Sequence, residues 1–179
     1  MTKRYYIIFS VISLIIVIIT TSIKLSKNKM ATAAGGTYTV NNIDQLISDS
    51  PLIIVGDVGE EKETIKEDGV KYKVSQINVV EILKGDIMVN SDGIKLMQMD
   101  IPQDPAVEKG KRVLLFLKQY KSKNFQDGYI CVGLGQGCYV IENKKLKPSS
   151  SISNSLKNSI EDQKDVLEYI KLKAAVGLK

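Results

Sequence analysis

Cys131 and Cys138 are the only cysteines among the 179 residues of this chain, and they are its first candidates for covalent chemistry. They stand at the two ends of the run Val132–Gly137, between segments that both have the composition of strands. A hairpin closed through Leu134-Gly135 places them directly opposite each other, and in a non-hydrogen-bonded pair the Cα atoms approach to about 4.5 Å. The sequence predicts either a disulfide or two small buried apolar residues.

Other residues of chemical interest give weaker signals. The chain has no histidine, which removes His-based acid–base catalysis and His metal ligands. Gly133–Gly137 (GLGQG) resembles half of a nucleotide-binding fingerprint, which needs a helix after the glycines. Cys138–Ile141 follows instead and has the composition of a strand, so we predict a turn or bulge there. Ser149–Ser151 lacks the context of a nucleophile elbow.

The acidic run Gly59–Gly69 (GEEKETIKEDG) admits two interpretations. We predict a solvated hairpin loop between two strands, ending in the turn signal Asp68-Gly69. The alternative is a calcium or ligand-sensing loop, although the acids do not follow the alternate spacing of such loops. No catalytic residue, metal ligand or cofactor is predicted anywhere in the chain.

The net charge of +5 does not indicate a nucleic-acid partner. Residues 1–30 hold five basic and no acidic residues, and the twenty-five basic residues less these five leave twenty, which equals the number of acidic residues. Nucleic-acid binding requires a basic face that neutralises phosphates. We therefore expect no nucleic-acid partner.

The basic residues near the N-terminus flank Tyr5–Ile23, an uncharged apolar segment of 19 residues. At 1.5 Å per residue it spans a hydrocarbon core of about 30 Å. Lys3 and Arg4 favour a cytoplasmic N-terminus, although three lysines follow the segment. We predict an uncleaved single-pass anchor at 1–23 that contacts membrane lipid. A signal peptide cleaved near Ala31-Thr32-Ala33 and a buried soluble helix are the alternatives.

A polar stretch rich in small residues, 24–41, is predicted to be a flexible tether. After it, residues 42–147 are predicted to form one β-rich domain, centred on Val70–Asp86 (VKYKVSQINVVEILKGD). Val70, Tyr72 and Val74 alternate with polar residues as in a half-buried strand, and Val79-Val80 breaks the alternation as a bulge does. Further strands are predicted at 52–58, 94–99, 113–117, 129–132 and 138–141, with a short helix at 42–47 and a loop at 101–109.

Residues 148–179 are predicted to be a serine-rich linker followed by one amphipathic helix, from about Leu156 to Lys173. Ser159 and Asp162 have the spacing of a capping box. An apolar stripe of this kind most often packs on the domain's own core, and a helix that binds a partner is the alternative. The stripe consists of Leu156, Ile160, Leu167, Ile170 and Ala174.

The order of these pieces across Ser50–Ile141 resembles the netrin-like domains, the group that includes the tissue inhibitors of metalloproteinases. The matching pieces are SPLIIVGDV, YKVSQINVVEILKG, GKRVLLFL and DGYICV. The resemblance implies a mainly β (α+β) fold: a five-stranded OB-like barrel with helices at its side. The inhibitors act through an N-terminal cysteine that chelates a metal, and no cysteine precedes Cys131 here, so that activity is not implied.

We therefore expect a non-enzymatic binding or interaction domain, held outside the cytoplasm by a single-pass anchor, with an envelope protein as its candidate partner. The alternatives are a cell-envelope hydrolase, an inhibitor of an envelope protease, and a sensor that uses the acidic run.

Overall fold

The computed structural model describes residues 38–67, 69–87, 93–125 and 127–177. The predicted anchor and most of the predicted tether lie outside these residues. No helix in the described part of the chain is long and apolar enough to cross a membrane. The account below concerns the domain that begins at Tyr38.

A long antiparallel hairpin, β1 (Leu52–Glu67) and β2 (Val70–Lys84), is the first part of the sheet. The prediction of a loop at 59–69 is wrong, because β1 continues to Glu67 and only the turn around Gly69 joins the strands. The charged half of β1 is a strand because β2 offers it partners: Ile65 lies opposite Tyr72, for example. We call this outer half of the hairpin, Gly59–Ser75, the arm.

The predicted bulge in β2 is confirmed. The pairing register with β1 passes from Glu81↔Val55 to Val79↔Gly56, which leaves Val80 unpaired. A Cβ atom on Gly56 would lie 2.5 Å from Cγ2 of Ile77, so the two strands approach closely at the bend.

Three further strands close the barrel: β3 (Ile94–Gln98), β4 (Arg112–Tyr120) and β5 (Gly128–Cys131). The hydrogen-bonded order is β1-β2-β3-β5-β4, and β4 returns to pair with β1. The contact between β3 and β5 is parallel, and the other pairs are antiparallel. The structure thus confirms a mainly β fold with a closed five-stranded barrel.

Where β1 and β4 pair, the barrel wall is buried on both faces. Its interior holds an apolar cluster that includes Ile54, Ile77, Leu96 and Leu115. Outside, a second cluster lies between β1, β4 and the helices, and its largest members are Phe116 and Tyr139, whose rings meet edge to face with centroids 5.9 Å apart.

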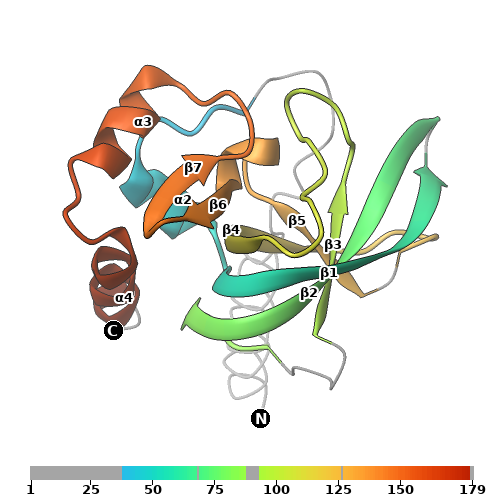
Figure 1. Cartoon of the computed structure of the whole chain (residues 1–179), viewed down its shortest axis with the longest axis horizontal. Coiled ribbons are helices and arrows are strands. Elements are labelled where there is room, and N and C mark those ends of the chain that lie inside the picture. The colour runs from blue at the N-terminus through green and yellow to red at the C-terminus, as the bar shows by residue number, and fades with distance from the viewer. Residues whose placement is uncertain (1–37, 68, 88–92, 126, 178–179) are drawn as a thin grey trace, which may run out of the picture. The chain divides into compact units, whose positions relative to one another are not determined.

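The helices lie on one side of the barrel, and the arm extends from the other side (Figure 1). The predicted helix at 42–47 is confirmed as α2 (Ile43–Asp49), with Asn42 as its N-cap. Strands β6 (Cys138–Glu142) and β7 (Lys145–Pro148) extend the sheet beyond β4. The predicted C-terminal helix is present but divided into α3 (Asn154–Glu161) and α4 (Val166–Gly177).

The predicted capping box at Ser159 and Asp162 is wrong. Ser153 caps α3, since its Oγ accepts a hydrogen bond from the Leu156 N–H, and Asp165 accepts one from the Glu168 N–H at the start of α4. Ser159 instead accepts a hydrogen bond from the Ile43 N–H, which joins α3 to α2. The predicted stripe does face the core, with four members buried and Leu167 packed beside them.

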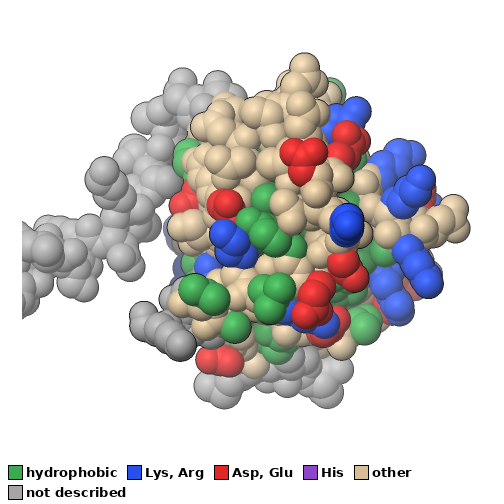
Figure 2. Space-filling view, turned by 90° about the vertical axis from the view of Figure 1, so that its left-hand side faces the viewer, with side chains coloured by type: hydrophobic (Ala, Val, Ile, Leu, Met, Phe, Trp, Pro, Cys, Tyr) green, Lys and Arg blue, Asp and Glu red, His purple; other side chains and the backbone are tan. Residues whose placement is uncertain are grey.

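The face that carries α3 and α4 shows hydrophobic side chains interspersed with acidic and basic ones (Figure 2). Leu172 and Val176 of α4 are the most exposed large hydrophobic residues of the described chain. Scattered exposed apolar residues among charges are normal for a solvated helix.

The two-sided burial of β4 gives a direct test of the core. Phe116 is 1% exposed, so Phe116→Ala should lower the free energy of unfolding by about 3–5 kcal/mol, through lost burial and the cavity it leaves. Urea denaturation of both proteins measures this difference. Leu172→Ala, at a side chain that is 60% exposed, is the matched control and should change stability by less than about 1 kcal/mol. Equal effects of the two substitutions would contradict the assignment of Phe116 to the core.

Candidate functional site

A pocket of about 300 Å³ opens between the arm and the 99–110 loop, which joins β3 to β4. From the arm, Lys73 and Ser75 project into it, because they lie on the face of β2 that continues into the barrel interior through Ile77. The complete lining consists of Gly59, Glu61, Lys73, Ser75, Asp100, Ala106, Val107, Glu108 and Lys109.

The loop that forms the other wall is held in shape by the buried Gln98 side chain. Its Nε2 donates a hydrogen bond to the Pro105 carbonyl (2.8 Å), and its Oε1 accepts one from the Val107 N–H (3.1 Å). Asp100, with a left-handed φ of 53°, accepts a hydrogen bond from the Ala106 N–H. These contacts fix the loop without regular secondary structure.

Lys73 lies between two carboxylates. Its Nζ is 3.1 Å from Asp100 Oδ2 and 3.7 Å from Glu61 Oε2. The hydrogen bond to Asp100 raises the pKa of Lys73, and the same bond lowers the pKa of Asp100. Both groups therefore keep their charges at neutral pH, and the lysine is not available as a neutral amine for proton transfer or nucleophilic attack.

Two further glutamates of the arm pair with different lysines, and Glu67 Oε2 accepts a hydrogen bond from the Tyr120 hydroxyl. Glu60 contacts Lys109 at the rim of the pocket, and Glu63 Oε1 lies 3.9 Å from Lys95 Nζ. Within the described ranges, no three Cys, Asp or Glu side chains converge in a way that could hold a metal ion. The acidic run is therefore a strand whose charges are distributed among separate ion pairs.

Asp104 is the most unusual carboxyl group of the domain, because it is 5% exposed. Its Oδ2 accepts a hydrogen bond from the Met99 N–H (2.9 Å), whereas Oδ1 has no hydrogen-bond partner among the described residues. Removal from water raises its pKa above the ordinary value. Asp104 thus holds the loop through its hydrogen bond with Met99, although burial disfavours its charged form.

The two cysteines do not lie across a hairpin, so that part of the prediction is wrong. Both β5 and β6 pair with the same strand, β4: Cys131 lies opposite Leu117, and Cys138 lies opposite Leu115. The chain between them leaves the sheet and forms the short 3₁₀ helix η1 (Leu134–Gly137). Both thiols are buried in the barrel interior.

The glycine-rich run forms the bend that the sequence predicts, and β6 follows it directly. Gly133 has a φ of 65°, which favours glycine. A Cβ on Gly135 would lie 2.6 Å from the Gln103 carbonyl oxygen and 2.7 Å from Ser150 Oγ, so the residue is packed between two segments. The serine run supplies packing here, and Ser149 donates its backbone N–H to the Cys138 carbonyl.

Sequence reasoning missed the pocket. One usable signal was that Lys73 and Ser75 alternate on the face of the strand that points into the barrel. The interior of a closed barrel is filled by apolar side chains, so polar residues on that face indicate that the strand extends beyond the end of the barrel. The role of Asp100 and Asp104 depends on a loop fold that the pattern DIPQDP does not specify.

The buried carboxyl gives a pH-dependent prediction. The pKa of Asp104 in the folded state exceeds the unfolded value of about 3.9. Above a pH of about 4 the folded state therefore binds more protons than the unfolded state does, and the free energy of unfolding falls as the pH rises through that range. Asp104→Asn removes this titration, so its stability relative to the wild type should improve from pH 4 towards pH 7. Urea midpoints measured across this range test it, with exposed Asp127→Asn as the control. A constant difference at all pH values would contradict the prediction.

No family model and no curated protein matches this chain.

Proposed function

We propose that this protein is a membrane-anchored, extracytoplasmic binding domain of OB-like, netrin-like type, and that it binds a polar segment of an envelope protein in the pocket between the arm and the 99–110 loop. The anchor is Tyr5–Ile23, as the apolar run indicates.

The state of Lys73 is the observation that carries this proposal. Its charge is fixed by Asp100 and Glu61, so the pocket offers permanent charges of both signs beside polar and aliphatic surface. Charges that do not titrate near neutral pH serve recognition by complementary hydrogen bonds and ion pairs. Acid–base catalysis needs a group whose pKa lies near the working pH, which favours binding over the hydrolase alternative.

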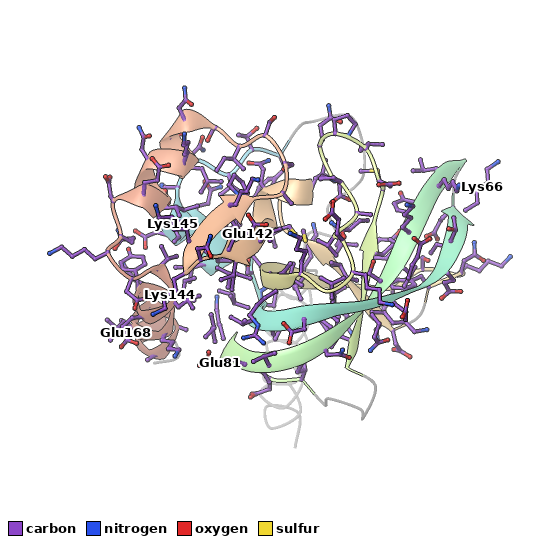
Figure 3. All side chains as sticks on the ribbon, viewed as in Figure 1. Lys66, Glu81, Glu142, Lys144, Lys145 and Glu168 are labelled. Carbon is purple, nitrogen blue, oxygen red and sulfur yellow. The ribbon has the colours of Figure 1, made fainter. Side chains whose placement is uncertain are left out.

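The first described residues of the chain are held by the segment between the two cysteines. Residues 38–40 reach the domain at the Gly133–Gly137 loop, where Gln136 Oε1 accepts a hydrogen bond from the Val40 N–H (3.1 Å). Lys66 marks the tip of the arm on one side of the domain, whereas Lys144, Lys145 and Glu168 lie on the helical side (Figure 3).

The family part of the proposal is supported by the closed barrel with helices at its side, which is what the resemblance implies. OB-type barrels commonly bind ligands through loops and strand faces at one end.

Topology is the first test. A reporter fused after Lys179 should be active if it functions only outside the cytoplasm, because Lys3 and Arg4 keep the N-terminus inside. The same fusion made with a reporter that functions only in the cytoplasm should be silent. Activity of the cytoplasmic reporter would refute the proposed location.

The second test concerns the pocket. A photo-crosslinking amino acid replaces Lys109, a rim residue whose side chain is 66% exposed, in the full-length protein in its own membranes. The matched control carries the same group at exposed Lys164, between α3 and α4. We expect a discrete adduct at position 109 and none at 164, read by immunoblot and mass spectrometry. Adducts of equal yield at both positions, or none at 109, would exclude the pocket as the contact site.

A further inference from the structure

The two thiols occupy positions that a covalent bond can join. Their pairing partners, Leu115 and Leu117, are two residues apart on one strand, which corresponds to about 6.6–6.8 Å between Cα atoms. Cα separations in disulfides extend to about 6.8 Å. Alternation along β4 puts both partners on the interior face, and both cysteines belong to the interior cluster.

The thiols are also in direct contact. A hydrogen bond between Cys131 and Cys138, together with complete burial, raises the pKa of the Cys131 thiol. Asp104 acts on the same thiol through its charge, and the Oδ1 atom of this buried carboxyl has no hydrogen-bond partner among the described residues. Two thiols and a carboxyl group in contact with apolar surroundings are poorly solvated in the reduced form, whereas a disulfide has no thiol proton to satisfy.

The segment between the cysteines makes contacts with two separate parts of the chain. Gln136 holds the incoming chain, since its Oε1 accepts the Val40 N–H and its Nε2 donates to the Tyr38 carbonyl. Gly135 donates its N–H to the Gln103 carbonyl in the loop that walls the pocket. A bond across the base of this segment therefore restrains both the chain that leads to the anchor and the pocket loop.

We propose that Cys131 and Cys138 form a disulfide in the mature protein, which closes the Val132–Gly137 segment into a covalent loop and locks the chain that leads to the anchor onto the barrel. This inference rests on the proposed extracytoplasmic location for its oxidising environment.

The reaction needs a disulfide donor, such as a thiol-oxidising enzyme of the envelope or oxidised glutathione. One cysteine thiolate attacks a sulfur of the donor, breaks the donor's S–S bond and releases one donor thiolate. The second cysteine thiolate then attacks the mixed disulfide, forms the Cys131–Cys138 bond and releases the second donor thiolate. The two cysteines lose two protons and two electrons in total, and the donor is reduced by the same two electrons. Since both side chains are buried in the folded domain, the exchange takes place before the barrel closes.

The state in the cell is tested on the full-length protein in its membranes, quenched with acid and alkylated in denaturant without reductant. We expect no alkylated cysteine and a peptide mass that shows 131 joined to 138. Two alkylated cysteines would overturn the proposal. Cys131→Ala should leave one alkylated thiol at 138, which controls for access of the reagent.

A second measurement distinguishes a failure of geometry from a failure of location. Purified full-length protein is first reduced and unfolded, and is then equilibrated with mixtures of reduced and oxidised glutathione, either during refolding into native buffer or in about 8 M urea. In urea the disulfide closes the same short loop in an unfolded chain. The difference between the two conditions therefore measures how much the folded structure favours the disulfide. Each bond formed consumes one oxidised and releases two reduced glutathione molecules. By linkage, a bond that the fold favours therefore forms in native buffer at a ratio of the oxidised glutathione concentration to the square of the reduced glutathione concentration that is at least about tenfold lower than in urea.

No shift, or a shift in the opposite direction, would overturn the geometric argument whatever the compartment. The expected shift together with free thiols in the cell would overturn the bond in the mature protein and point to the location as the cause. Hydrogen exchange adds a structural readout: the Val40 and Gly135 amides should exchange at least about tenfold more slowly in the oxidised protein.

Discussion

The pairing of β1 with β4 is the constraint on which the rest of this domain depends. Over Leu52–Asp57 and Arg112–Leu117, two nearly continuous apolar runs lie side by side in antiparallel register. Ile53 opposite Phe116 and Val55 opposite Leu114 face the helices, whereas Ile54 opposite Leu115 faces the barrel interior. Each strand contributes to two hydrophobic clusters at once, so a loss of this pairing exposes both. This is why the two runs can be apolar on both faces in a mainly antiparallel sheet.

The same pairing ends at a defined point and so creates the arm. At its last pair, Arg112 donates two hydrogen bonds to the carboxylate of Asp57, at 2.8 and 2.9 Å. Beyond it, Val58 exchanges hydrogen bonds with Gly110 and Lys111, and then β1 continues with β2 alone. The charged composition of the arm follows from this position, because a strand with one open edge resists unwanted pairing when it carries alternating charges. The pocket lies in the angle between the arm and the loop that leads into β4.

Much of this framework could be predicted from the sequence, since the strands depend on local patterns. The long strand, its bulge at Val80 and the apolar strand around Phe116 follow from periodicity and β-branched residues. Where the sequence misled, tertiary contacts override local preference. Residues 59–67 look like a loop but pair with β2, and Leu156–Lys173 looks like one helix but divides where Asp165 caps a second one. The pocket was not predictable in the same way. Lys73 and Asp100 are brought together by closure of the barrel and by a loop that the Gln98 side chain holds through hydrogen bonds.

The cysteines show how a correct local interpretation can support a wrong arrangement. Two strands separated by a glycine-rich bend suggest a hairpin, and each of these elements is present. The hairpin fails because β4 is long enough to pair with both strands in succession, and each gains more by joining the buried β4 than by pairing with the other. Cys131 and Cys138 are therefore neighbours along one line of the sheet instead of partners across it. The segment between them lies outside the sheet, so its polar groups can form hydrogen bonds with other parts of the chain. Gln136 accepts a hydrogen bond from the Val40 N–H and donates one to the Tyr38 carbonyl. Closure of the barrel thus determines where the chain that precedes the domain is attached, as well as how the core is packed.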